Sequence, residues 1–325
     1  MHIDELIGRG RTALDLGRAI EALFLLGSAW LLSPESPERE RDLDRCVAAG
    51  AKLSTLSNLS KLQVVEVDGD PQPYVVSAWV VGTALYARQN ARDGDPWAAI
   101  DLLLTLFRHD PTLPLLERGL TWLDACPDAP MDSDDVLILR LVGVGSWGVG
   151  PLACPLPDED RAIRSLQALL RLLIRMETGS KEVRVHADLL ASAILLRLNQ
   201  IPLAIHRAAR AVTRRRTPES LACLAVAHRA AGQLTPALAA FSAAAELCPS
   251  HMCDPVPHWE NAGDCARLLR RYPEAAKWYR LVLARRPNNV RAAAYVRFSE
   301  MSIHQPTVGS AWDYHPDATI TQQNL

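Results

Sequence analysis

The chain has 325 residues, of which 49% are hydrophobic and only 6% aromatic, a composition that suits a helical protein packed through Leu and Ala. It begins Met-His-Ile-Asp-Glu, with acidic residues where a secretory signal needs basic ones. The most apolar early run, residues 19–32, is interrupted by Glu21 and is too short to span a bilayer. We therefore expect a cytoplasmic protein without a membrane segment, whose seven cysteines are reduced thiols.

The net charge of −2 is the sum of two halves of opposite charge. Residues 1–160 carry 25 acidic and 13 basic side chains, a net charge of −12. Residues 161–325 carry 12 acidic and 22 basic side chains, a net charge of +10. The two halves are therefore electrostatic opposites.

Residues 3–34 place small and large side chains at fixed distances and end at a proline. With Pro34 counted as position 32, the matching positions are 4, 8, 11, 15, 20, 24, 27 and 32, occupied by Leu6, Gly10, Ala13, Gly17, Ala22, Leu26, Ala29 and Pro34. Small residues let two antiparallel helices approach closely, large residues fill the space beside them, and proline ends a helix. This spacing predicts a helical hairpin.

The next segment departs from the spacing. Residues 35–45 form a charged loop that leads into a helix ending near Gly50. Residues 62–76 place the strand-like sequences LQVVEV and YVV on either side of Asp68-Gly69-Asp70-Pro71. Two interpretations stay open for this stretch: a short β-hairpin across Asp-Gly, or a loop that ends before the following helix.

The spacing returns between residues 80 and 111 and predicts another hairpin, followed by a helix over 113–125. Its matching residues are Ala87, Gly94, Ala99, Leu103, Leu106 and Pro111. Residues 128–157 are the least repeat-like part of the chain. They include a G-x-G-x-x-G match at residues 143–148, but prolines follow where a phosphate-binding helix would have to begin, so we interpret it as a glycine-rich turn.

A long helix is predicted from Asp158 to Met176, and a hairpin from residues 183–198 and 202–216. Residues 161–216 carry 12 basic and three acidic side chains, and Arg207, Arg210 and Arg214 share one helical face. We interpret this face as solvated. An acidic partner or nucleic acid is the alternative, and the lack of interleaved aromatic residues weakens the nucleic-acid version.

Two consecutive copies of the spacing lie between Pro218 and Pro287. The first copy has Leu221, Leu224, Ala225, Gly232, Ala237, Phe241, Ala244 and Pro249. The second copy has Trp259, Ala262, Gly263, Ala275, Tyr279, Val282 and Pro287. This pattern resembles the tetratricopeptide repeat (TPR), W-x2-L-G-x2-Y followed by A-x3-F and P.

The resemblance implies an all-α fold: a TPR-like α-solenoid of antiparallel helical hairpins with an irregular central segment. We expect an N-terminal TPR-like helical block at 1–127, an irregular Gly/Pro-rich connection at 128–157, and a C-terminal TPR block with a capping helix at 158–304. The capping helix is predicted from Asn289 to Ile303. Residues 305–325 are expected to be a polar tail.

The resemblance also implies a concave groove lined by the first helix of each repeat. The groove residues that it selects are Leu189, Leu190, Leu196, Val226, Arg229, Glu260, Asn261, Asp264 and Arg267. We expect a cytoplasmic adaptor that binds a protein or peptide partner there, an acidic one among the options, without a cofactor. Nucleic acid is disfavoured. Only Asn261 has a counterpart in the Lys/Asn/Arg clamp with which some TPR co-chaperones hold a carboxylate, so chaperone tails are disfavoured too.

One alternative is a helical-scaffold enzyme or a metal-dependent accessory protein. Its candidate metal ligands form a cluster between residues 248 and 265, namely Cys248, His251, Cys253, His258 and Cys265. Their spacing fits no familiar zinc finger, so we prefer buried thiols and surface histidines. The C-terminal tail from His304 to Asp317 is the other candidate site. No catalytic residues are identified, which favours a non-enzymatic role and leaves an enzyme as the alternative.

Overall fold

The computed structural model describes residues 1–32, 36–58, 64–67, 74–109, 115–126, 159–248 and 253–304. Within these ranges the chain is α-helical apart from one short 3-10 turn and one pair of short strands, which confirms the predicted all-α class. The chain divides into two compact units, Met1–Val136 with Pro155–Leu172, and Leu137–Cys154 with Leu173–Leu325. The block boundaries predicted near residues 127 and 158 lie outside the described residues and stay predictions.

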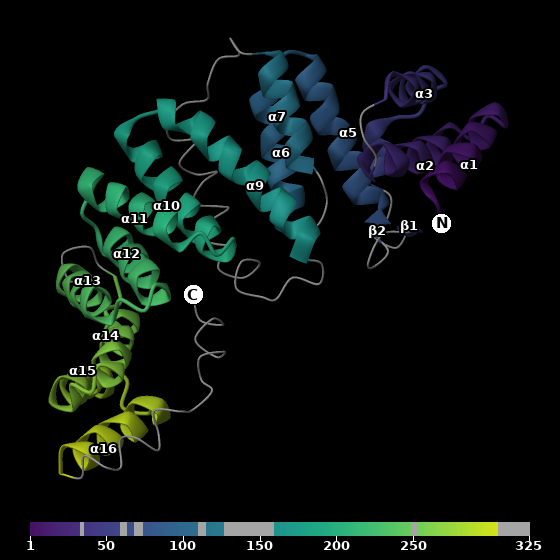
Figure 1. Ribbon diagram of the computed structural model, residues 1–325. Helices are drawn as coiled ribbons and strands as arrows, with labels where there is room; N and C mark the ends of the chain where they lie inside the picture. The colour runs from purple at the N-terminus through teal and green to yellow at the C-terminus, as the bar shows by residue number, and fades with distance from the viewer. Residues whose placement is uncertain are drawn as a thin grey trace. The chain divides into compact units, whose positions relative to one another are not determined.

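The first unit contains two helical hairpins, α1 with α2 and α5 with α6, as the spacing predicts (Figure 1). Its elements are α1 (Ile3–Asp15), α2 (Ala19–Leu32), α3 (Pro37–Ala48), α4 (Leu53–Asn58), β1 (Val64–Val67), β2 (Tyr74–Ser77), α5 (Ala78–Arg92), α6 (Pro96–His109), α7 (Leu115–Ala125) and most of α9 (Glu159–Arg175). The strands pair antiparallel, with Val64 opposite Ser77. Of the two interpretations left open for this stretch, the structure therefore has paired strands.

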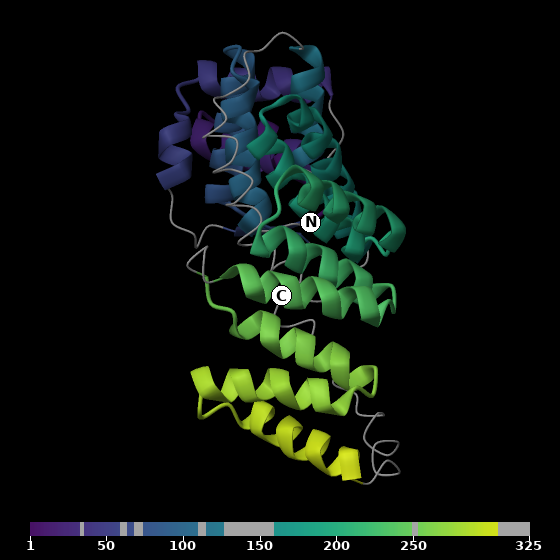
Figure 2. The same cartoon turned by 90° about the vertical axis from the view of Figure 1, so that its left-hand side faces the viewer.

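The second unit is a row of hairpins, α10 with α11, α12 with α13, and α14 with α15, each packed on the next (Figures 1 and 2). Its elements after α9 are η1 (Met176–Thr178), α10 (Lys181–Arg197), α11 (Ile201–Arg214), α12 (Pro218–Ala230), α13 (Leu234–Leu247), α14 (Val256–Leu268), α15 (Tyr272–Arg285) and α16 (Val290–His304). The last helix packs on α15, in the place predicted for the capping helix.

Helix α3 lies outside the repeat spacing, and polar contacts attach it to the first unit. The indole Nε1 of Trp30 on α2 donates to Glu40 on α3 at 2.6 Å. Arg88 on α5 donates through Nε to Glu40 at 2.7 Å and through Nη2 to Asp44 at 2.8 Å. Because the Arg88 and Glu40 side chains are only 7% and 29% exposed, the charge-assisted bond between them is sheltered from water and is stronger than a surface pair, whereas Asp44 is half exposed.

The helices of each hairpin approach closely where the spacing places a small residue opposite a large one. A Cβ atom added to Gly10 would lie 2.6 Å from Cγ of Leu26. One added to Gly263 would lie 2.8 Å from Cε1 of Tyr279. Both glycines occupy position 8 and both large residues position 24, so the contact inferred from the spacing is the one that the structure makes.

A shared backbone turn joins the two helices of five hairpins. One residue in each turn has a positive φ, between +55° and +89°, namely Gly17, Gly94, Asn199, Gly232 and Arg270. The amide of the following residue donates to the carbonyl five residues earlier at 2.8 to 2.9 Å, as in the bond from Gln233 to His228. This is the Schellman arrangement that ends a helix and reverses the chain.

Substitutions at Gly8 and Gly10 on α1 test separately how helix propensity and close packing affect stability. Gly10→Ala should lower the free energy of unfolding by about 1–3 kcal/mol, because its methyl group would overlap Leu26. Gly8→Ala should instead raise it by up to about 1 kcal/mol, because nothing lies within 4 Å and Ala favours the helix. Urea denaturation monitored by circular dichroism measures both. Equal effects of the two substitutions would contradict the packing assignment.

Substitutions at Gly232 measure the free-energy cost of the left-handed turn alone, because a Cβ atom there would meet none of the described residues within 4 Å. The order of stability should be Gly232, then Gly232→Asn, then Gly232→Ala, with about 1 kcal/mol lost in the Ala variant. Thermal unfolding ranks the three proteins. An Ala variant as stable as the wild type would mean that the turn does not require positive φ.

Candidate functional site

The nine residues that the TPR resemblance selects all lie in the second unit, on three first helices. We call this set the first-helix surface: Leu189, Leu190 and Leu196 on α10, Val226 and Arg229 on α12, and Glu260, Asn261, Asp264 and Arg267 on α14. Leu190 and Asp264 are buried, and the other seven are half-buried. The structure thus places seven of the nine side chains where a ligand could touch part of each.

Side-chain hydrogen bonds link the first helices to one another. Arg229 on α12 donates through Nη1 to Oδ1 of Asn261 on α14 at 2.5 Å. Asn261 is itself oriented, because its Nδ2 donates to the carbonyl of Pro257 one turn earlier at 2.7 Å. On the other side, Asn289 donates through Nδ2 to Glu260 at 2.7 Å. The predicted polar residues of α12 and α14 therefore form one polar strip, whereas those predicted on α10 are apolar.

Asp264 is the buried centre of this strip. Its Oδ1 accepts from the hydroxyl of Tyr279 at 2.6 Å, and its Oδ2 accepts from Arg291 on α16 at 2.7 Å. Burial of the phenol, together with the negative charge of Asp264, raises the pKa of Tyr279 well above its ordinary value. Tyr279 therefore stays protonated and keeps donating its hydrogen bond, so Asp264 is a structural anchor of the surface.

Two arginines of the surface keep their charge without a carboxylate partner. In the part of the chain that the structure describes, neither Arg229 nor Arg267 forms an ion pair. The guanidinium of Arg267 lies 4.9 Å from the ring centre of Tyr295, and that of Arg229 lies 5.7 Å from the ring of Phe241. The Nε atom of Arg267 is buried and has no hydrogen-bond partner among the residues that the structure describes. Both side chains therefore pack against aromatic rings, and Arg229 is also held by its bond to Asn261.

Helix α16 also contributes to the polar strip, which the residues selected from the sequence did not include. Arg291 and Tyr295 extend the strip by one helix, through the contacts to Asp264 and Arg267. Helix α14 begins at Val256 and α16 at Val290, 34 residues apart, which is one TPR period. Extending the 34-residue period past Pro287 would have placed Arg291 and Tyr295 on the first-helix surface.

The basic face of α11 is not the solvated surface that the sequence predicts. Arg207 donates to Asp188 at 3.1 Å and pairs with Glu177, and Arg210 pairs with Glu177 at 3.1 Å. Arg214 pairs with the same Asp188, which is fully buried on α10. The prediction was wrong because all three arginines pair with a buried carboxylate on the partner helix. A buried carboxylate without such partners would be very costly.

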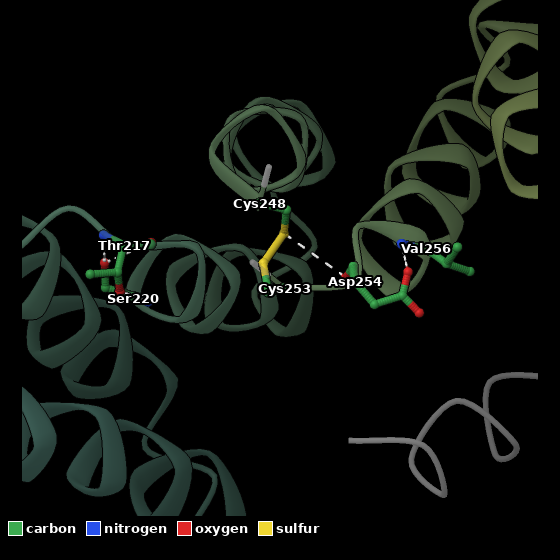
Figure 3. Close-up of a disulfide and its surroundings, with 6 residues drawn as sticks. All are labelled: Thr217, Ser220, Cys248, Cys253, Asp254 and Val256. Carbon is green, nitrogen blue, oxygen red and sulfur yellow. Dashed lines mark hydrogen bonds between the residues drawn. A yellow bond between two sulfur atoms is a disulfide. The ribbon is translucent and has the colours of Figure 1, made fainter. Parts of the chain in front are cut away.

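The cysteine-histidine cluster is only partly assembled. Cys248 and Cys253 form a disulfide with their Cα atoms 4.9 Å apart, which corrects the expectation that all the cysteines are reduced (Figure 3). The chain between α13 and α14 brings the two residues together across five positions. His258 joins them, with a ring nitrogen within 4.8 Å of both sulfurs. Cys265 is a buried free thiol outside this group, and His251 lies outside the described residues.

The G-x-G-x-x-G match at 143–148 lies outside the described residues, and of the candidate tail site from His304 to Asp317 only His304, the last residue of α16, belongs to the described part. Among the described residues, none of the helices combines the length and apolar character needed to cross a membrane.

No family model matches the sequence. No curated protein matches it either. Similar solved structures include the apo form of RapI, with 8% identity, a TM-score of 0.42, and coverage of 99% of this chain and 85% of that chain. A Rap protein complexed with Competence and Sporulation Factor has 12% identity and a TM-score of 0.39, covering 98% and 85%. The APC/C hetero-tetramer Cut9-Hcn1 has 14% identity and a TM-score of 0.35, covering 93% and 62%.

The class of this protein is defined by its own hairpins and their shared turn geometry. It is a TPR-like helical-repeat protein, in which polar side chains of α12, α14 and α16 form one strip.

The ion network around Glu177 predicts a pH dependence. Burial opposes ionisation of Glu177, but hydrogen bonds from Arg207 and Arg210 outweigh it and lower its pKa below the ordinary 4.5. Its ionised form therefore stabilises the fold above about pH 4.5, and this contribution is lost as the pH falls through the folded-state pKa. Glu177→Gln should be less stable than the wild type at neutral pH, and the difference should shrink below pH 4.5. Urea unfolding at several pH values measures it, and a constant difference would contradict the assignment.

Proposed function

We propose that this chain is a cytoplasmic, non-enzymatic scaffold that binds a protein or peptide segment on its first-helix surface. The observation that carries the proposal is the pair of half-buried arginines, Arg229 and Arg267, on successive first helices and, among the described residues, without ion-pair partners. Half-buried arginine side chains move less than those on an open surface, so a ligand carboxylate would gain more from them.

The charge around these arginines favours an acidic segment. Asp264 is neutralised by Arg291, and Glu260 is occupied by the amide of Asn289. Glu260 keeps its negative charge, since a neutral amide does not cancel a carboxylate, so together with Arg229 and Arg267 this part of the surface has a net charge of +1. A ligand that carries one or two carboxylates with suitable spacing would complement the two arginines.

The other end of the surface is apolar. Leu189, Leu196 and Val226 are half-buried on α10 and α12, so part of each side chain stays in water. A ligand with acidic residues followed by apolar ones would cover both parts of the surface, because the arginines bind carboxylates and the leucines and valine pack against apolar side chains.

The basic face of α11 gives little support to nucleic acid as the ligand. Arg207, Arg210 and Arg214 are already paired with Asp188 and Glu177 inside the second unit. Their charges are therefore not available to neutralise phosphates, and phosphate neutralisation supplies most of nonspecific nucleic-acid affinity.

A displayed library of random peptides tests the proposal without any assumption about the natural partner. Peptides selected on the wild-type chain should be enriched in Asp and Glu, because carboxylates complement the two arginines. In fluorescence anisotropy they should bind Arg229→Glu/Arg267→Glu at least about tenfold more weakly, since like charges would then face each other.

The matched control is Arg216→Glu/Arg285→Glu, which changes the net charge equally at two arginines outside the surface. This control should bind the selected peptides like the wild type. If both double variants bind the peptides equally weakly, the loss of binding is an effect of net charge alone. Unchanged binding by Arg229→Glu/Arg267→Glu would move the site elsewhere, provided that circular dichroism finds every variant folded.

A further inference from the structure

A second site of different chemistry lies where α13 meets α14. Cys248 ends α13 and is fully buried, Cys253 is half-buried in the connection, and His258 is in the first turn of α14. One ligand atom from each residue lies within 4.8 Å of the other two. A disulfide alone makes no use of an imidazole, so the position of His258 beside both sulfurs calls for a separate explanation.

Two sulfurs and an imidazole nitrogen are a ligand set that suits zinc. At Zn–S distances of about 2.3 Å and Zn–N distances of about 2.0 Å, tetrahedral ligand atoms lie roughly 3.5 Å apart. The three atoms here fit within a limit of 4.8 Å, so side-chain rotations that move each of them by about 1 Å would suffice. Carboxylates are not needed to complete the set, and thiolates select zinc over harder ions such as magnesium.

Two hydrogen bonds and one ion pair hold the backbone around the cluster in place. The amide of Cys253 donates to the carbonyl of Cys248 at 3.2 Å, which closes the connection. Asp254 accepts from the amide of Val256 at 3.1 Å at the start of α14 (Figure 3). The side chain of Asp254 also pairs with Arg286, directly after α15. A framework fixed in this way keeps the ligands together when the bond between the sulfurs is opened.

We propose that the reduced chain binds one zinc ion through Sγ of Cys248, Sγ of Cys253 and a ring nitrogen of His258. A thiol reductant supplies two electrons, and with two protons the disulfide becomes two thiols while the reductant becomes a disulfide. Zinc then displaces both thiol protons and binds two thiolates. Water takes the fourth tetrahedral position.

The metal and the disulfide exclude each other, because both use the same two sulfurs. In a reducing compartment the thiols persist, so the zinc form is the one expected there. The site would join the end of α13 to the first turn of α14, and it stands independently of the proposed peptide binding.

Metal analysis of the full chain tests this proposal. Protein reduced with a phosphine under argon, loaded with Zn²⁺ and passed into metal-free buffer should retain one zinc per chain. Cys248→Ser, Cys253→Ser and His258→Ala should each lose it. Cys265→Ser and Cys223→Ser should keep it, because these free thiols are outside the group. Circular dichroism checks that each variant is folded.

Cobalt substitution in the wild-type chain provides a readout that needs no variant. Co²⁺ in the reduced chain should give intense thiolate-to-metal absorption and the visible bands of tetrahedral coordination. Loss of zinc from Cys265→Ser, retention by His258→Ala, or retention by the oxidised chain would overturn the assigned ligands. Absence of both zinc and the cobalt spectrum in the reduced chain would overturn the site itself.

Discussion

The close contact between a small residue on one helix and a large residue on the next is the constraint on which this structure depends. At Gly10 and Leu26, and again at Gly263 and Tyr279, the larger side chain occupies the space that a Cβ atom would need. In the hairpin of α12 and α13 the corresponding residues, Ala225 and Phe241, are both buried in one hydrophobic core. Interiors packed at crystal-like density tolerate little overlap, so this contact fixes how near the helices lie.

The spacing of the helices in turn decides which polar residues can meet. Because hairpins stack with similar geometry, residues on successive first helices come within hydrogen-bonding distance, as Arg229 and Asn261 do. The same stacking puts Asp264 between Tyr279 and Arg291. The polar strip is therefore a product of the packing, and a ligand on it would contact several repeats at once.

The sequence predicts those parts of the fold that depend on residue size at fixed positions. Gly17, Gly94 and Gly232 mark three of the five turns, because glycine adopts positive φ at little cost. Asn199 and Arg270 adopt the same backbone without glycine, so composition alone does not mark their turns.

Contacts between side chains far apart in the sequence were harder to predict. Arg207 and Arg214 have the spacing of an exposed basic face, and their real partner, Asp188, lies on another helix. The disulfide was missed because the path of the chain between Cys248 and Cys253 decides whether the sulfurs meet. The members of the first-helix surface follow from the repeat spacing, whereas their pairing depends on the actual distances between helices.

A double-mutant cycle at Gly263 and Tyr279 tests the central constraint most directly. Gly263→Ala in the wild-type background should lower the free energy of unfolding by about 1–3 kcal/mol, because its methyl group overlaps the ring. In the Tyr279→Ala background the same substitution should be neutral or slightly stabilising, which gives a coupling energy above about 1 kcal/mol. Equal costs in both backgrounds, measured by urea denaturation, would contradict the claim that the small-to-large contact sets the packing of the hairpins.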